Sequence, residues 1–278
     1  MSLDARITPL RDGVASQTLE GLVRAEVYLE PRLRVCAAAA AGIHRAPDPA
    51  SEQLDQLLYG ESFDVLEDET GGFVWGQAHR DGYVGFVAAS ALAAPGPAPT
   101  HRVSALRTYA FEEDSIKSKA LGPYSMNALV AVEGGEGRLR SVAGAGWMAA
   151  DHLAPIGVFE TDFVAVAERF LGTPYLWGGR ESLGLDCSGL VQQALLACGQ
   201  ACPRDTDQQE ALGREVARGD LARGDLVFWK GHVAVALDAG RILHANAHHM
   251  AVAIEPLDPA IQRIAAAGGG QPTRFRRL

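Results

Sequence analysis

Cys187 lies between an aspartate and a serine in the stretch GLDCSGLV, residues 184–191. The pattern CSGLVQQALLACG begins at this residue and is helical, so the thiol would lie in the first turn of a helix. Unpaired backbone N–H groups and the helix dipole at such a position can lower a thiol pKa from about 8.5 to about 3.5–7.5. A buried structural cysteine is the alternative reading, because free cysteines are usually buried.

A nucleophilic cysteine needs a base, and the base needs an orienting partner. His232 begins the strand-like stretch KGHVAVAL, and His244 ends the next one, RILHANA. If these strands pair across the DAGR turn, His232 can reach Cys187 while His244 holds the far ring nitrogen of His232. His248 and His249 fall in the following turn, where we expect solvated side chains, and they are second choices for the third position.

Three local patterns indicate the elements that hold these residues. The stretch ETDFVAVAERFLG predicts a helix with Thr161 or Asp162 at its N-cap and an end at Gly172. The helix that starts at Cys187 should stop at Gly199. Alternating apolar residues then predict strands joined by turns. A helix carrying the cysteine, followed by an antiparallel sheet, predicts an α+β domain over residues 158–278.

An internal repeat organises the region before this domain. GFVAASALAAP begins at Gly85 and GWMAADHLAP at Gly146, each after short β-prone runs joined by Gly-rich turns. We therefore predict two small β-barrels, residues 43–94 and 100–155, joined by the proline-rich linker APGPAPT. Chance similarity of alanine-rich strands is the alternative. Residues 1–42 form a separate N-terminal segment, in which LEGLVRAEVYLEPRL fits a helix or an extended strand.

Composition limits the partners and the compartment. The 278 residues are 47% hydrophobic and 21% charged, with a net charge of −9 and no basic tract, so nucleic acid and membrane are not expected partners. We expect a monomer in the cytoplasm, because the N-terminus does not read as a signal peptide and no apolar run suits a membrane helix. The four cysteines should then be reduced thiols.

No metal or cofactor is expected. Cys198 and Cys202 are four residues apart at a helix end, but there is no second cysteine pair, so a zinc site is disfavoured. Thiol chemistry itself needs neither a metal nor an organic cofactor.

Several motifs together resemble the NlpC/P60 papain-like cysteine peptidases. They are, in the family's order, GTPYLWGGRESLGLDCSGLV, PRDTDQQ, GDLVFWKGHVAVAL and RILHANA, and they cover roughly the last 120 residues. DGYVGF and AGWM resemble the Gly-aromatic motif of bacterial SH3-type (SH3b) domains. The whole chain is similar to cytoplasmic γ-D-glutamyl-L-diamino acid endopeptidases that recycle cell-wall peptides. The second module is rich in alanine and glycine and departs most from the pattern.

This resemblance implies a role for each matching residue. Cys187 matches the nucleophile, His232 the general base and His244 the orienting residue. Tyr175 matches a tyrosine beside the nucleophile, and its hydroxyl could share an oxyanion hole with the N–H of Cys187; its alternative role is a core aromatic. The implied reaction is hydrolysis of the bond between γ-D-glutamate and a diamino acid, meso-diaminopimelate or L-lysine, through a thioester on Cys187.

The recycling subgroup also requires a free N-terminal L-Ala on its substrate. The resemblance assigns recognition of this amine to Asp186 and Ser188 beside the nucleophile, and to Glu61 from the first SH3b domain. Tyr83 is a weaker candidate from that domain, and Asp205 and Thr206 stand where a further hydrogen-bonding residue is expected. Glu61 could equally be a solvated surface charge.

Three other functions remain open. The chain could be a remodelling hydrolase of intact peptidoglycan, which would need export and would act on sacculi. It could be an NlpC/P60-type amidase or acyltransferase on another amide. It could also be a wall-binding protein with an inactive peptidase domain, although the cysteine and the histidine are both present.

Overall fold

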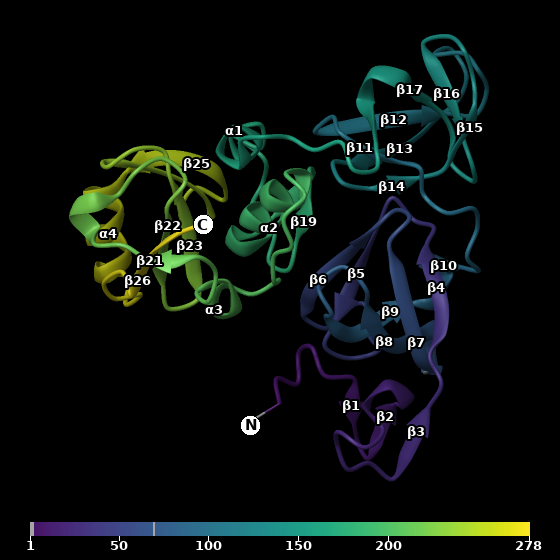
Figure 1. Ribbon diagram of the computed structural model, residues 1–278, viewed down its shortest axis with the longest axis horizontal. Helices are drawn as coiled ribbons and strands as arrows, with labels where there is room; N and C mark the ends of the chain where they lie inside the picture. The colour runs from purple at the N-terminus through teal and green to yellow at the C-terminus, as the bar shows by residue number, and fades with distance from the viewer. Residues whose placement is uncertain (1–2, 69) are drawn as a thin grey trace. The chain divides into compact units, whose positions relative to one another are not determined.

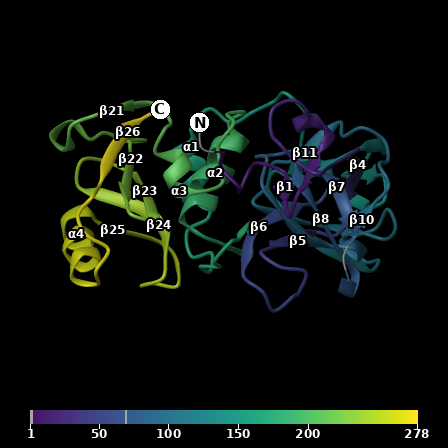
Figure 2. The same ribbon diagram turned by 90° about the horizontal axis from the view of Figure 1, so that it is seen from below.

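The computed structural model describes residues 3–68 and 70–278, which fall into two compact units, Met1–Ile156 and Gly157–Leu278. The first unit is all strand and turn apart from short 3-10 helices, whereas the second combines four α-helices with a sheet. Figures 1 and 2 show the strands and helices of the two units. Among the described residues, no helix has both the length and the apolar character to cross a membrane.

The first module of unit 1 is a seven-stranded antiparallel sheet in the order β10-β4-β7-β8-β9-β5-β6. The predicted boundary at residue 43 falls inside β5 and leaves β4, which pairs with β7 and β10, outside the module. The strands are β4 (Arg32–Cys36), β5 (Ala40–His44), β6 (Gln53–Leu58), β7 (Ser62–Asp68), β8 (Phe73–Ala78), β9 (Val84–Ala88) and β10 (Leu92–Ala93).

The segment before β4 is extended and contains no α-helix in its described residues. It forms a small sheet in the order β1-β2-β3, and β3 pairs in parallel with β2. Of the two readings left open for residues 19–33, the strand reading is therefore the right one. The strands are β1 (Leu10–Arg11), β2 (Val14–Ser16) and β3 (Val27–Leu29).

The second module of unit 1 has two antiparallel sheets, in the orders β14-β11-β18 and β13-β12-β17-β16-β15. The residues 93–100 that link it to the first module are exposed throughout. Its strands are β11 (His101–Val103), β12 (Arg107–Phe111), β13 (Ala120–Ser125), β14 (Leu129–Val130), β15 (Val132–Gly134), β16 (Leu139–Val142), β17 (Gly146–Ala149) and β18 (Leu153–Pro155).

The repeated sequences form the same local structure in both modules. In each, a strand leads into a 3-10 turn and a second short strand: β9, Ala89–Ala91 and β10 in the first, and β17, Ala150–His152 and β18 in the second. Gly146 has a φ of +95° and lies against the carbonyl of Phe111, which a Cβ atom would approach to 2.4 Å. The glycine that opens the second repeat is thus required by both its φ and its close packing.

Unit 2 is built on a six-stranded antiparallel sheet in the order β21-β26-β22-β23-β24-β25. Within this unit the sheet lies between α2 and α4 (Figures 1 and 2). The β23–β24 hairpin across the DAGR turn forms as predicted. The sheet strands are β21 (Arg214–Glu215), β22 (Leu226–Trp229), β23 (His232–Ala236), β24 (Arg241–Asn246), β25 (Ala251–Pro256) and β26 (Arg274–Arg277); a separate ribbon joins β19 (Arg180–Glu181) and β20 (Gly184–Leu185).

The helix that carries Cys187 begins and ends where the sequence predicts, whereas α1 ends at Glu168, four residues before the predicted stop at Gly172. Asp162, rather than Thr161, is the N-cap of α1 and accepts hydrogen bonds from the N–H groups of Val164 and Ala165. Gly199 follows the end of α2 with a φ of +75°, as a helix stop does. The helices are α1 (Phe163–Glu168), α2 (Cys187–Ala197), α3 (Thr206–Gln209) and α4 (Leu257–Ala266).

Candidate active site

Cys187 is the first residue of α2 and is 6% exposed. Asp186 caps the helix by accepting a hydrogen bond from the N–H of Gly189 at 2.8 Å. The sulfur lies 3.8 Å from the hydroxyl of Thr206 and accepts a hydrogen bond from the backbone N–H of Val233, which adjoins His232 in β23. The thiol is therefore placed where the start of α2 meets the start of β23.

The protonation of this thiol differs from the expectation for a cysteine at a helix start. Burial and, to a lesser degree, the Asp186 carboxylate raise the pKa of Cys187 to about 11, against the opposing effects of Val233, Thr206 and Arg204. A charged sulfur loses more solvation on burial than a neutral one, which is why desolvation dominates here. The prediction of a lowered thiol pKa is wrong for this site, whose resting form is a neutral thiol.

The two histidines meet as the hairpin pairing predicts. Nε2 of His232 and Nδ1 of His244 are 2.8 Å apart and share a hydrogen bond. In the register of β23 and β24, Ala236 lies opposite Ile242, so the alternation along each strand puts both histidines on one face of the sheet.

Both imidazoles are neutral near pH 7. Burial, with smaller effects of His244 and Arg263, lowers the pKa of His232 to about 3, against the opposing effect of Glu255. Burial likewise lowers the pKa of His244, against the opposing effect of Glu255. A neutral His232 can accept a proton, which is the state that a general base requires.

Glu255 is a site residue that the sequence analysis missed. Its Oε1 lies 2.7 Å from Nε2 of His244, and it also accepts a hydrogen bond from Arg263 of α4. Although burial alone would raise the pKa of Glu255, its bonds to His244 and Arg263 lower it to about 2, so the group is a carboxylate. The only sequence signal was a single carboxylate in an apolar strand, AVAIEP, which is common on half-exposed strands.

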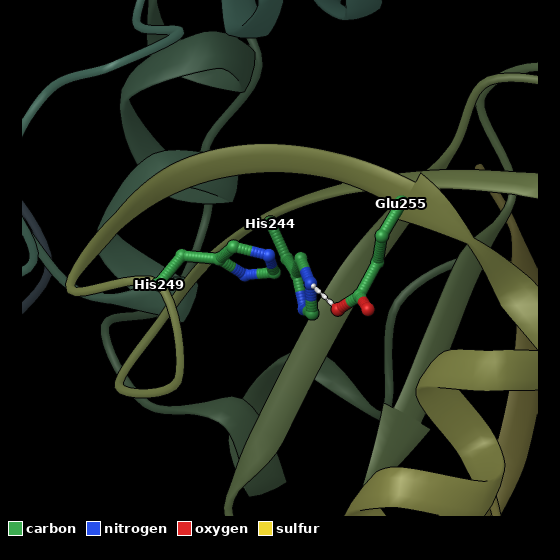
Figure 3. A group of neighbouring side chains, drawn as sticks. All are labelled: His244, His249 and Glu255. Carbon is green, nitrogen blue, oxygen red and sulfur yellow. Dashed lines mark hydrogen bonds and ion pairs between the residues drawn. The ribbon is translucent and has the colours of Figure 1, made fainter.

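Ligand atoms of His244, His249 and Glu255 lie within 4.8 Å of one another, which is close enough to hold a metal ion (Figure 3). His249 is exposed, and its Nδ1 is bonded to Asn246. Because Glu255 already accepts from His244 and Arg263, a cation there would face the guanidinium. The residues present therefore fit a hydrogen-bonded chain better than a metal centre.

Tyr175 lies in the loop before β19 and is half-buried. Burial raises the pKa of its phenol, and the nearby Cys187 and Asp186 raise it further. The hydroxyl is therefore protonated at neutral pH and can donate a hydrogen bond beside the thiol, as an oxyanion-hole residue must.

Asp186 is already fully engaged. Its Oδ1 accepts from Gly189, Ser188 and Nη1 of Arg204, and its Oδ2 accepts from Gly178 and from Nη2 of Arg204 at 2.6 Å. Ser188 also accepts from Arg204, at 2.8 Å. Two of the predicted amine-recognising residues are thus held by an arginine that the sequence analysis did not single out.

The PRDT segment supplies Thr206 beside the thiol and Asp205 at the start of α3. Asp205 forms a capping box with Gln208, so its side chain has a local structural task. Thr206 is 7% exposed and contacts Cys187. Thr206 therefore lies beside the candidate nucleophile.

The two candidates from the first module occupy different environments within unit 1. Glu61 is 2% exposed, and it accepts hydrogen bonds from Arg80 at 2.7 Å and from the N–H of Leu58 at 2.9 Å. It is therefore not a solvated surface charge. Tyr83 is 3% exposed and packs in the apolar core of the module, beside residues such as Ile43 and Leu57. Packing accounts for its presence there.

Two regions of the chain match known protein families. The NlpC/P60 family model matches residues 172–264, and the model of the bacterial dipeptidyl-peptidase SH3 domain matches residues 43–92. A γ-D-glutamyl-L-lysine dipeptidyl-peptidase of Bacillus subtilis is 29% identical over 211 residues, which cover 68% of this chain and 71% of that protein. Dipeptidyl-peptidase 6 of Lysinibacillus sphaericus is 27% identical over 253 residues, 80% of this chain and 90% of that one.

Among solved structures, an NlpC/P60 family protein from Bacillus cereus matches with a TM-score of 0.76 and 21% identity, covering 88% of this chain and 99% of that one. At this identity the match speaks for the fold alone. The two family models, with the cysteine and histidines at the site, identify the C-terminal part of the chain as an NlpC/P60 cysteine peptidase domain, preceded by a bacterial SH3 domain.

Proposed function

We propose that the protein hydrolyses the bond between γ-D-glutamate and a diamino acid in free cell-wall peptides that carry an N-terminal L-Ala. The observation that carries this proposal is the contact of Cys187 with the start of β23, where His232 is bonded to His244. The name of the Bacillus subtilis relative, a γ-D-glutamyl-L-lysine dipeptidyl-peptidase, supports the choice of bond, and the second relative is also a dipeptidyl-peptidase.

The first half of the reaction follows from the protonation states. The neutral thiol of Cys187 gives its proton to Nδ1 of His232, because Nε2 of His232 is bonded to His244. The sulfur bonds to the γ-carbonyl carbon, and the C=O electron pair moves to oxygen. The N–H of Cys187 and the hydroxyl of Tyr175 would stabilise this oxyanion. The C–N bond then breaks, and His232 returns the proton to the leaving amine.

The second half releases the enzyme. A water gives a proton to His232 while its oxygen attacks the γ-glutamyl thioester. The tetrahedral intermediate collapses with loss of the sulfur, which recovers the proton from His232. The products are an acid ending in γ-D-glutamate and the free diamino acid, and no electron acceptor or cofactor takes part.

The proposal also includes recognition of the free N-terminal amine of the substrate by carboxylates. An ammonium in a closed site requires an anion, and Glu61 and Asp186, aided by Ser188, stay the candidates. Each carboxylate already holds an arginine, Arg80 or Arg204. A substrate ammonium would therefore share a paired carboxylate, so we expect selectivity for the free amine to be moderate.

The remaining parts of the proposal concern the architecture and the compartment. We propose that residues 100–155 form a second SH3b-type barrel, supported by the shared strand, 3-10 turn and strand of the two repeats. We also propose that the protein is a monomer acting in the cytoplasm on recycled peptides. Subcellular fractionation and sedimentation of the purified chain test these two points.

The deciding experiment is mass spectrometry of reactions with three substrates: L-Ala-γ-D-Glu-meso-diaminopimelate, its N-acetylated form and intact sacculi. The L-Lys tripeptide extends the series, and Cys187→Ala is the control. Preferred cleavage of the free-amine tripeptides, lost in the control, is the expected result. Equal cleavage of the acetylated peptide, or release from sacculi, would instead indicate a wall-remodelling hydrolase. No cleavage of any substrate would overturn the proposal.

A further inference from the structure

Glu255 stands at the end of a row of polar side chains that crosses three neighbouring strands. In the register of β24 and β25, Glu255 lies opposite Ile242, two residues from His244 and on the same face of the sheet. The His244 side chain is fully buried, and that of Glu255 is 12% exposed. The row runs from His232 on β23 through His244 to Glu255, with hydrogen bonds of 2.8 and 2.7 Å.

The direction of these two hydrogen bonds follows from their last acceptor. An ionised carboxylate can only accept, so Nε2 of His244 must carry the hydrogen. A neutral imidazole has one N–H, and Nδ1 of His244 is therefore an acceptor. The hydrogen between the two rings must then belong to Nε2 of His232. This leaves Nδ1 of His232 without a hydrogen.

We propose that Glu255 is a positioning residue that fixes the proton positions of both histidines, so that the free lone pair of His232 is on Nδ1, the nitrogen that must take the thiol proton. This inference rests on the proposed function, because it assumes that the thiol of Cys187 is the reacting group. Its evidence is the strand register and the two hydrogen bonds of His244. It assigns a task to a residue that does not touch the substrate.

Arg263 strengthens this assignment. It lies in α4, which begins directly after β25, and it donates to the same Oε1 that accepts from His244. The arginine side chain is 27% exposed, so it can be hydrated if its partner is removed. An anchored carboxylate keeps its oxygen at His244 in one geometry, as residues behind a catalytic histidine commonly do.

Two substitutions separate the hydrogen-bond acceptor from the negative charge. Glu255→Leu removes the acceptor, and we expect kcat to fall roughly 10²-fold with little change in KM, since the wrong tautomer of His232 becomes populated. Glu255→Gln keeps an oxygen that can accept from His244, and we expect it to recover most of this loss. Asp238→Asn, in the exposed β23–β24 turn, is a matched control and should leave activity unchanged.

Substrate-free measurements keep this test separate from the choice of substrate. Nitrogen-15 NMR of the histidine rings should show His232 protonated at Nε2 and bare at Nδ1 in the wild type, and a mixture of tautomers in Glu255→Leu. Alkylation of Cys187 by iodoacetamide should slow in the same variant. Unchanged ring-nitrogen signals in Glu255→Leu would overturn the inference, as would a Glu255→Gln enzyme as impaired as Glu255→Leu, whether or not the proposed peptide is the substrate.

Discussion

Two carboxylate–arginine pairs of unit 2, Asp186–Arg204 and Glu255–Arg263, contact the elements that carry Cys187 and the histidines, and they differ in what they hold. Asp186 and Arg204 have side-chain exposures of 10% and 1%, whereas Glu255 and Arg263 have 12% and 27%. Asp186 accepts hydrogen bonds from the backbone N–H of Gly189 in the first turn of α2, from the N–H of Gly178 in the loop before β19, and from Arg204. Glu255 accepts instead from an imidazole, a side chain with two possible tautomers.

The contrast shows that a carboxylate–arginine pair can either hold backbone segments together or determine which nitrogen of a histidine ring carries the proton. Around Cys187, the Asp186–Arg204 pair ties the β19–β20 ribbon and the α3 segment to the helix start, because Arg204 also bonds the carbonyl of Gly179. On the sheet, the Glu255–Arg263 pair determines which ring nitrogens carry hydrogen. Damage to the first pair should therefore affect folding, and damage to the second should affect the chemical step.

The largest effect should come from Arg204→Met. The change leaves Asp186 as a buried carboxylate without its guanidinium partner, which typically costs about 3–5 kcal/mol of unfolding free energy. Urea denaturation followed by circular dichroism measures this. Arg223→Met removes an exposed partner of Asp162 and Glu168 and should cost only about 0–1 kcal/mol. Equal losses in the two variants would show that burial of the Asp186–Arg204 pair does not matter.

His244→Leu should remove the hydrogen bond between His232 and His244 without unfolding the protein. His232 then loses the acceptor of its Nε2–H, and we expect kcat to fall about 10²-fold in the proposed reaction. KM should be nearly unchanged, because the lost bond is remote from substrate groups. The thermal unfolding midpoint serves as the control, and a variant that loses activity only in proportion to lost folded protein would contradict a role in the chemical step.

How far the sequence could predict this site depends on whether each feature is local. The helix start at Cys187, the stop at Gly199 and the β23–β24 hairpin depend on residues a few positions apart, and all three form as expected. Arg204 was not predicted because it is 18 residues from Asp186, and only the packing of α3 brings them together. Glu255 was missed because its task depends on the register of β24 and β25.

Two other differences have the same origin. The sequence did not assign β4 to the first module because β4 joins its sheet only through pairing with β7 and β10, which lie about 30 and 60 residues along the chain. The thiol pKa was predicted in the wrong direction because the helix start is visible in the sequence, whereas the burial of Cys187 is a product of the tertiary fold. Local rules therefore placed Cys187 at a helix start and did not describe its environment.

The pH dependence of Cys187 alkylation distinguishes a neutral thiol from a thiolate in the resting enzyme. Because the pKa of Cys187 is raised to about 11, the thiolate fraction should grow with pH well beyond 9. The rate of reaction with iodoacetamide, followed by peptide mass spectrometry, should therefore keep rising between pH 7 and 10. A plateau between pH 5 and 8 would instead mean that a thiolate–imidazolium pair forms in the resting enzyme.

The raised pKa of Cys187 also affects stability. The free energy of unfolding should fall as the pH rises, whereas the alkylation rate should increase. The folded state keeps the thiol proton to a higher pH than the unfolded chain, whose cysteine titrates near its ordinary value of 9.0. The contribution of Cys187 to stability is therefore complete below about pH 9 and is lost as pH rises towards 11. Cys187→Ala should show a weaker fall in unfolding free energy across this range than the wild type.

The smallest effect should follow Asp162→Ala at the start of α1, a helix whose cap holds no reacting group. Its side chain accepts from the N–H groups of Val164 and Ala165, so the change should cost about 1 kcal/mol of unfolding free energy. Asp162→Asn keeps an accepting oxygen and should cost less. Because the Asp162 side chain bonds Val164, Ala165 and Arg223 and none of these is Cys187 or a site histidine, kcat per folded molecule should be unchanged. A large loss of kcat in Asp162→Ala would mean that backbone order at the site depends on more of the unit than the Asp186–Arg204 pair alone.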